Sequence, residues 1–444
     1  MKPPISLSLS ATLLLLTLYP AKSTAWLPWS NKNITSTNGT NLFEQTNGKI
    51  RGVNLASLFV LEPWMAPSEW SSMGCADTKS EFDCVLHLGQ NKADASFRQH
   101  WDTWITREDL HNITTLGLNT VRVPVGYWLY EELVDRESEY FPRGGWEFFE
   151  RVCRWAAEEG VYVIVDLHGA PGAQVAMNPD TGQYAPSPGF YNAYQYDRAE
   201  TFLAWLTAQI HSNSNFSTVG MIELVNEPIQ NPDQVASMRT DFYPNAIAKI
   251  RSKENTTVPK ASYLHIQMMS KSWGSGDPNQ ALTNNDTSYL AYDDHRYLKY
   301  NTSIAMTKDS YLSASCGENA SDAQDTPVVV SEWSLSPAQA VEGSKAWAPE
   351  SKSNKKFYKK WFAAQVHAFE KGALGWVFWG WKQELGDYRW GYQDAVNAGV
   401  IPKDLGSVLD MKVCSGQIKK QITPSVRNML VICLVIAISF PLMK

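Results

Sequence analysis

The chain has 444 residues, of which 44% are hydrophobic and 19% are charged. This balance supplies enough apolar material for a large core and too little charge for an intrinsically disordered chain, so we expect a globular protein. The 39 Lys and Arg residues against 45 Asp and Glu residues leave a formal net charge of −6. That charge argues against nucleic acid as a main partner, and no nucleic-acid function is expected.

The first 25 residues have the layout of a secretory signal peptide. Lys2 precedes an apolar stretch around Leu13–Leu18, and Ser23-Thr24-Ala25 forms a small-x-small cleavage site. Residues 26–48 are rich in Ser, Thr and Asn without apolar periodicity, and they are predicted to be a glycosylated leader. Asn-x-Ser/Thr sequons fit a secreted, extracellular or cell-wall protein, and they lie at Asn33, Asn38, Asn112, Asn215, Asn255, Asn285, Asn301 and Asn319.

From residue 49 to residue 414, strand-like and helix-like segments alternate. Segments 146–159, 199–210 and 355–371 carry an apolar stripe at helical spacing. Continuous apolar runs such as Val161–Val165 are typical of parallel strands covered on both faces. The predicted strands are Ile50–Ser57, Thr120–Val125, Val161–His168, Met221–Asn226, Tyr263–Met269, Leu290–His295, Pro327–Glu332 and Leu374–Trp379. The pattern predicts an α/β fold, a single (β/α)8 TIM barrel with extended βα-loops.

The cysteines are too few for a disulfide scaffold, but some should pair in an oxidising compartment. Cys75 and Cys84 lie in one polar loop, so we expect them to pair. Cys153 falls on the apolar face of a predicted helix, where a buried free thiol is expected. Within residues 49–414 that leaves Cys316 and Cys414, which we expect to pair.

Residues 415–444 form a polar spacer followed by an apolar tail. Small residues at Ser415-Gly416, a polar stretch and the apolar run Met429–Met443 have the layout of a cleaved glycolipid-anchor signal. A short membrane tail anchor and a gene-model extension remain open as alternatives. On the first two interpretations the protein would be anchored at the outer cell surface, by the glycolipid or by the tail itself.

Active-site residues of (β/α)8 barrels lie where strands end and βα-loops begin. Glu227 and Glu332 follow the fourth and seventh predicted strands, where a carboxylate is costly to desolvate unless it is paired or used. Two carboxylates across a barrel mouth can approach to about 5 Å, the spacing of a retaining glycosidase. The other polar or aromatic residues at strand ends are Asn54, Arg122, His168, Asn226, His295 and Trp379.

Two other function classes fit parts of this pattern. Metal hydrolases on the same fold use His and Asp ligands, which Asp166-Leu-His168 and Asp294-His295 could supply. The first predicted strand has no His-x-His pair, so no metal and no cofactor are expected. A non-catalytic carbohydrate-binding barrel would keep the aromatic residues and lack one of the two carboxylates, but both are present.

The strand-end motifs of this chain resemble those of glycoside hydrolase family 5 over about residues 49–414. Asn226-Glu227-Pro228 resembles the family's acid/base signature, and Glu332, followed by Trp333, matches its nucleophile position. The resemblance implies that Glu227 protonates the leaving oxygen and later activates water, while Glu332 attacks the anomeric carbon. The family's supporting positions match Arg122, His168, His295, Tyr297 and Trp379.

Within the family the chain looks most similar to fungal β-glucanases, through segments that include 51–54, 61–64 and 100–106. Three stretches, 73–84, 178–192 and 385–395, are closer to endo-β-1,6-glucanases than to exo-β-1,3-glucosidases. The exo-1,3 enzymes carry an aromatic clamp, and its two positions here are Met177 and Tyr300. We therefore expect cleavage of internal β-1,6 bonds of β-glucan by a monomer, with an exo-β-1,3-glucosidase as the alternative.

The resemblance also implies roles for the residues around the two carboxylates. Asn226 would hold the sugar's 2-hydroxyl, and Arg122 and Tyr297 would orient Glu332. His168 and His295 would line the reactive subsite over an apolar floor formed by Trp379. Glu62 and Trp64 would contact hydroxyls and a ring face.

Overall fold

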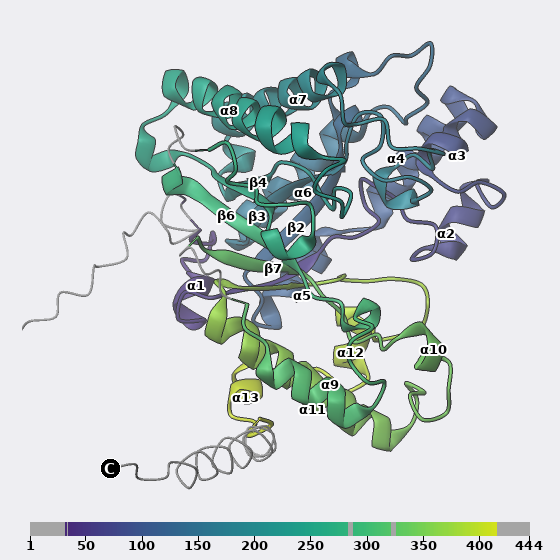
Figure 1. Ribbon diagram of the computed structural model, residues 1–444, viewed down its shortest axis with the longest axis vertical. Coiled ribbons are helices and arrows are strands. Elements are labelled where there is room, and N and C mark those ends of the chain that lie inside the picture. Colours follow the sequence, from purple (N-terminus) through teal and green to yellow (C-terminus); the bar gives the residue numbers. More distant parts are fainter. Residues whose placement is uncertain (1–31, 33, 283–286, 321–325, 415–444) are drawn as a thin grey trace, which may run out of the picture.

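The computed structural model describes residues 32, 34–282, 287–320 and 326–414 (Figure 1). The predicted signal peptide, the sequons at Asn33 and Asn285, and the C-terminal tail lie outside the described residues. In the described part of the chain, no helix is both long and apolar enough to cross a membrane.

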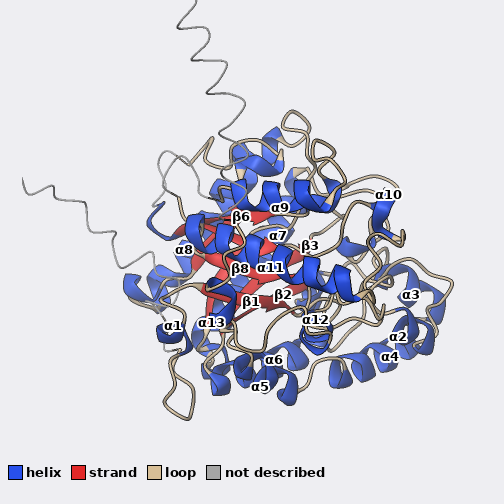
Figure 2. Ribbon diagram, turned by 90° about the horizontal axis from the view of Figure 1, so that it is seen from below, coloured by secondary structure: helices blue, strands red, loops and turns tan. Residues whose placement is uncertain are grey.

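The centre of the described structure is a closed barrel of parallel strands, which confirms the predicted fold class. The strands join in chain order and β8 pairs with β1 to close the ring. Figure 2 shows them in red at the centre, surrounded by helices. Their bounds are β1 Ile50–Asn54, β2 Thr120–Gly126, β3 Tyr162–Gly169, β4 Val219–Glu223, β5 His265–Met269, β6 Leu290–His295, β7 Val328–Glu332 and β8 Gly375–Phe378.

The helices cover the outside of the barrel and fill the longer loops. The segment between β1 and β2 contributes α2, α3 and α4, which lie together at one side of the molecule (Figure 1). The bounds are α1 Leu42–Gln45, α2 Pro67–Ser72, α3 Glu81–Leu88, α4 Gln90–Thr103, α5 Arg107–Thr115, α6 Gly145–Glu159, α7 Ala193–Ser212, α8 Tyr243–Thr257, α9 Lys308–Gly317, α10 Gln339–Glu342, α11 Lys352–Gly372, α12 Tyr392–Asn397 and α13 Gly406–Leu409.

Successive side chains of a strand point alternately toward the surrounding helices and into the barrel interior. On β3, Val163, Val165 and Leu167 pack in the large core cluster shared with the surrounding helices, whereas Tyr162 and Ile164 belong to a separate inner cluster. Continuing the inner row upward places Asp166 and then His168 inside the barrel. The interior therefore changes from apolar at the base to charged at the mouth, where parallel strands present their carboxyl ends.

Residues 34–48, predicted as a leader ahead of the domain, pack against the base of the barrel. Ile34 and Phe43 are buried in the inner cluster with Ile50 and Tyr162. The ring of Phe43 meets that of Tyr162 edge to face, with centroids 6.1 Å apart. Ile34 and the pair Leu42-Phe43 are separated by a polar stretch, so their spacing gives no periodic signal although all three side chains are buried.

The structure pairs the cysteines as predicted. One disulfide joins Cys75, beyond α2, to Cys84 in α3, and the other joins Cys316 in α9 to Cys414. Cys153 is buried and unpaired on α6. The second disulfide ties the last described residue back to the outer helices.

Several predicted strands extend beyond the observed ones. The first strand ends at Asn54 instead of Ser57, and the fourth covers Val219–Glu223 instead of Met221–Asn226. The chain beyond β4 still bonds to both neighbours, because Leu224 N donates to Gln267 O and Asn226 N donates to Leu167 O, each at 3.0 Å. Asn226 and Glu227 are therefore fixed by backbone bonds although they lie past the regular ladder.

Candidate active site

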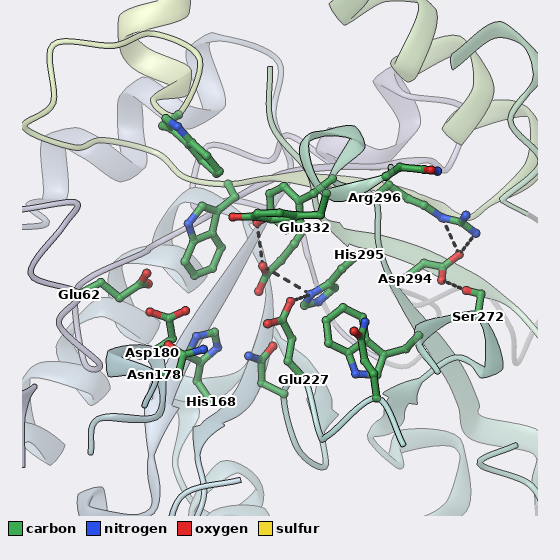
Figure 3. Close-up of a pocket in the computed structure, with 18 of the residues that line it drawn as sticks. Glu62, His168, Asn178, Asp180, Glu227, Ser272, Asp294, His295, Arg296 and Glu332 are labelled. Carbon is green, nitrogen blue, oxygen red and sulfur yellow. Dashed lines mark hydrogen bonds and ion pairs between the residues drawn. The ribbon is translucent and has the colours of Figure 1, made fainter. Parts of the chain in front are cut away.

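A cavity of about 680 Å³ opens at the carboxyl ends of the strands (Figure 3). It brings together nine of the ten predicted site residues, and the tenth, Arg122, lies buried beneath it. The lining residues are Glu62, Trp64, His168, Asn178, Asp180, Asn226, Glu227, Gln230, Ser272, Trp273, Asp294, His295, Arg296, Tyr297, Tyr300, Asn301, Thr302, Glu332, Trp379 and Trp390.

Glu227 and Glu332 face each other inside this cavity. One oxygen of each carboxylate and a ring nitrogen of His295 all lie within 4.8 Å of one another. Glu332 is the last residue of β7 and is 4% exposed. Glu227 has a φ of 40°, a left-handed conformation that residues other than glycine rarely adopt and that is typical of functional positions.

Arg122 supports the site from below. Its Nη1 donates to Glu332 Oε1 at 2.8 Å, and its Nη2 donates to Glu223 Oε2 at 2.7 Å. Asn54 and Asn226 each accept from the same guanidinium through their side-chain oxygens, at 3.0 and 2.9 Å. Because Oδ1 of Asn226 is occupied and its Nδ2 donates to no group in the described residues, that amide can donate to a substrate hydroxyl.

Two residues of the loop after β6 complete the contacts of the carboxylates. The Tyr297 hydroxyl donates to Glu332 Oε2 at 2.8 Å, so protein donors bind both oxygens of Glu332. His295 Nδ1 lies 2.6 Å from Glu227 Oε1 and 3.5 Å from Glu332 Oε2, while its Nε2 lies 3.3 Å from Asp293. His295 thus contacts both carboxylates of the cavity and, on its other side, the buried Asp293 inside the barrel.

Burial and neighbouring charge act in opposite directions on these groups. Burial raises the pKa of the Glu332 carboxyl, and the positive charges of His295 and Arg122 limit that rise. Burial alone would lower the pKa of His295, but Glu332 and Asp293 raise it well above its usual value. His295 is therefore protonated near neutral pH, which favours an ionised Glu332.

One wall of the cavity is aromatic and acidic. Trp379 stacks on His168 with ring centroids 5.7 Å apart, and Trp64 meets Trp390 edge to face at 5.1 Å. Trp64 Nε1 donates to Glu62 Oε2 at 2.7 Å. Burial, and next the charge of Asp180, raise the pKa of Glu62 well above its usual value. Aromatic faces beside hydroxyl-binding carboxyl groups are suited to sugar rings.

The opposite wall is polar and fixed by its own bonds. Asp294 accepts from Ser270 at 2.7 Å. It also accepts from Ser272 at 2.6 Å and from Arg296, as Figure 3 shows. Trp273 Nε1 donates to Pro228 O at 2.7 Å, directly beyond Glu227. This wall therefore places a guanidinium and an indole on the acid/base side of the site.

The residues considered as metal ligands do not converge. His168 Nδ1 is bonded to Asp166 at 2.6 Å, and Asp294 is taken up by serine hydroxyls and Arg296. Within the described ranges, the groups with metal-like spacing are Glu223 with Asp293 and His295, and Glu227 with His295 and Glu332. Arg122 already supplies a positive charge to both groups, at 2.7 Å from Glu223 and 2.8 Å from Glu332.

Sequence reasoning missed several residues of this site. Asp180, Trp273, Arg296 and Trp390 line the cavity, and Glu223 binds Arg122 inside the barrel. Asp180, Trp273 and Trp390 lie in long loops, where spacing does not indicate which side chain turns inward. Arg296 directly follows β6, between the predicted residues His295 and Tyr297, and its position at a strand end was a signal. Glu223 carried a signal, because an acidic residue within an apolar strand of a barrel needs a buried partner. Tyr300 lines the cavity, whereas Met177 is 60% exposed and does not.

Comparisons with known proteins agree with this geometry. The model of the cellulase family, glycosyl hydrolase family 5, matches residues 88–385. A protein of Neosartorya fischeri named probable glucan endo-1,6-beta-glucosidase B is 58% identical, with 88% of this chain and 96% of the relative covered. The glucan endo-1,6-beta-glucosidase B of Emericella nidulans is 54% identical, with the same coverage.

Two further proteins have lower sequence identity to this chain. The glucan 1,3-beta-glucosidase of Blumeria graminis is 29% identical, with 82% of this chain and 89% of that protein covered. A solved rutinosidase from Aspergillus niger superposes with a TM-score of 0.61 at 17% identity, with 79% of this chain and 97% of that chain covered, and supports the fold alone.

Proposed function

Because the chain belongs to glycosyl hydrolase family 5, we propose that it is a retaining β-glucanase that cleaves internal β-1,6-glucosidic bonds of β-glucan. The observation that carries this proposal is the pair of carboxylates Glu227 and Glu332, with oxygens within 4.8 Å of each other in the cavity. Retaining glycosidases need carboxyl groups about 5–5.5 Å apart, so that one can bond directly to the sugar. An inverting enzyme needs a wider gap for water.

The two carboxylates divide the reaction between them. Glu332, held by Arg122 and Tyr297, attacks the anomeric carbon while Glu227 gives a proton to the departing oxygen. Glu227 then removes a proton from the water that releases the sugar from Glu332. The structure holds Glu332 by two donors and leaves Glu227 24% exposed, which suits a fixed nucleophile and a group that exchanges protons.

The supporting residues act on the sugar that is being cleaved. The Nδ2 group of Asn226 donates to the 2-hydroxyl, because its Oδ1 is held by Arg122. Trp379 and His168 form a flat floor under the ring, and Glu62 and Trp64 bind hydroxyls and a ring face further along the wall. In this mechanism no metal and no cofactor takes part.

The β-1,6 linkage is supported by the relatives named glucan endo-1,6-beta-glucosidase, which are 54–58% identical to this chain, whereas the glucan 1,3-beta-glucosidase of Blumeria graminis is 29% identical. Met177 stands in solvent and builds no wall beside the site, which leaves the cleft open for a chain to continue past it. An exo-β-1,3-glucosidase would instead close around a chain end.

We further propose that the protein is secreted and acts as a monomer at the cell wall. The sequons and the signal-like first 25 residues support secretion. Residues 415–444 have the layout of a glycolipid-anchor signal, which would attach the protein to the outer face of the membrane.

The function is tested by incubating the protein with linear β-1,6-glucan and, separately, with linear β-1,3-glucan, and following product sizes. Oligomers of mixed length from the first substrate support the proposal. Glucose as the sole product, released from the second substrate, would instead establish the exo-1,3 activity.

A further inference from the structure

The sequon Asn301-Thr302-Ser303 lies at the rim of the cavity. Asn301 and Thr302, with the preceding Tyr300, line it on the loop that follows β6. Tyr300 meets Tyr297 edge to face, with ring centroids 5.9 Å apart, and Tyr297 donates to Glu332. A group attached to Asn301 would therefore lie next to Tyr300, whose ring contacts Tyr297, the residue that donates to the nucleophile Glu332.

The side chain of Asn301 is arranged for attachment of such a group. Its Oδ1 accepts from the backbone N of Ser303 at 3.0 Å and from the Ser303 hydroxyl at 2.6 Å. All three sequon residues are exposed, and Nδ2 of Asn301 donates to no group among the residues that the structure describes. The nitrogen that carries an N-linked glycan is thus free while the serine hydroxyl is held against the same amide.

The other described sequons differ in position or in bonding. Asn215 uses its Nδ2 to donate to Glu150 at 2.7 Å, and Asn255 accepts a bond from Tyr263. Asn38 is exposed, but it lies at the base of the barrel, where the adjacent Thr37 N donates to Glu158 O at 3.0 Å near the end of α6. Of the sequons within the described ranges, Asn301 alone lines the cavity.

We propose that Asn301 carries an N-linked oligosaccharide that narrows this end of the cleft to long glucan chains. The inference rests on the proposed function and on passage through the secretory pathway. In the attachment step, Nδ2 bonds to C1 of an oligosaccharide carried on a polyprenyl diphosphate, the bond from C1 to the diphosphate breaks, and the amide loses one proton. A hydrated oligosaccharide at the rim occupies space that a polymer passing over Tyr300 needs, whereas a short aryl glucoside does not reach it.

The experiment uses the full chain secreted from a eukaryotic host. Peptide mass spectrometry after enzymatic deglycosylation should show Asn301 converted to aspartate. Asn301→Gln and Ser303→Ala should each raise kcat/KM on linear β-1,6-glucan several-fold and leave kcat/KM on an aryl β-glucoside unchanged. Asn38→Gln, which removes an exposed sequon at the opposite end of the barrel, is the matched control and should change neither value.

A second preparation, from a bacterial host that attaches no glycan, separates the glycan from the side chain. There the parent and Asn301→Gln should hydrolyse the polymer equally. An unmodified Asn301 peptide, equal polymer rates in the glycosylated pair, or a difference that persists without glycan would each overturn the proposal. Absence of β-glucan hydrolysis by the parent would contradict the proposed function instead, since the peptide map is independent of activity.

Discussion

Arg122 Nη1 lies 2.8 Å from Glu332 Oε1, and both side chains are buried where the barrel interior meets the cavity. The guanidinium also contacts Glu223 and Asp166 below, at 2.7 and 3.0 Å. One cation therefore holds the proposed nucleophile in place and also binds the buried acids Glu223 and Asp166 beneath it. Only a planar fork with several donors can make these contacts together.

Arg122→Lys should impair catalysis and change its pH dependence. A lysine keeps one positive charge but cannot reach Glu332, Glu223 and the two asparagines together, so we expect kcat to fall by about 100-fold or more. Because the guanidinium lowers the pKa of Glu332, its loss should raise that pKa and move the acid limb of the kcat/KM profile to higher pH. An unchanged acid limb in a folded variant would show that Arg122 does not act on Glu332.

Replacing each carboxylate should impair a different step. Glu332→Ala should abolish turnover of every substrate, because no covalent intermediate can form. Glu227→Ala should still release an activated aryl leaving group that needs no proton, and azide should restore turnover by attacking the intermediate in place of water. Steady-state rates on aryl glucosides and on glucan distinguish the two roles, and equal losses on both substrates for Glu227→Ala would contradict the assignment.

Glu81 should make the protein less stable as the pH rises. This residue is fully buried, and burial raises its pKa to about 8 although Leu61 N donates to Oε1 at 2.8 Å. Between the unfolded-state pKa and about 8 the folded state holds the proton more tightly, so the free energy of unfolding falls with rising pH, by at most about 1.4 kcal/mol per pH unit.

Glu81→Gln should remove that part of the pH dependence, because the amide cannot ionise. Urea unfolding of both proteins at pH 5 and pH 8 measures the difference. If the two proteins lose the same stability over this range, Glu81 is not the responsible group.

The two disulfides should differ in their contribution to stability. Cys316–Cys414 spans 98 residues, and its removal by paired serine substitutions should lower the free energy of unfolding by about 4–5 kcal/mol. Cys75–Cys84 spans 9 residues and should contribute about 2–3 kcal/mol. Denaturant unfolding of the two double variants tests this order, and a larger loss from the shorter loop would contradict it.

The sequence was sufficient to predict the barrel and the two carboxylates. Apolar strands alternate with amphipathic helices along the chain, and polar residues at the strand ends mark the mouth of the barrel. Glu227 and Glu332 follow from this rule, whereas Arg122 lies within β2 and is buried beneath the cavity. Asp180, Trp273 and Trp390 do not follow from it, because they lie in long loops whose path is set by contacts distant in sequence. The packing of residues 34–48 at the base of the barrel was also missed, since Ile34 and the pair Leu42-Phe43 are separated by polar residues and show no period.

The most direct test of the central claim is proton NMR of linear β-1,6-glucan during its first minutes of hydrolysis. The account predicts that new reducing ends appear first as the β anomer and convert to α only by mutarotation, on oligomers of mixed length. If the α anomer appeared first, the covalent intermediate on Glu332 would be contradicted. If glucose were the sole product, cleavage of internal bonds would be contradicted.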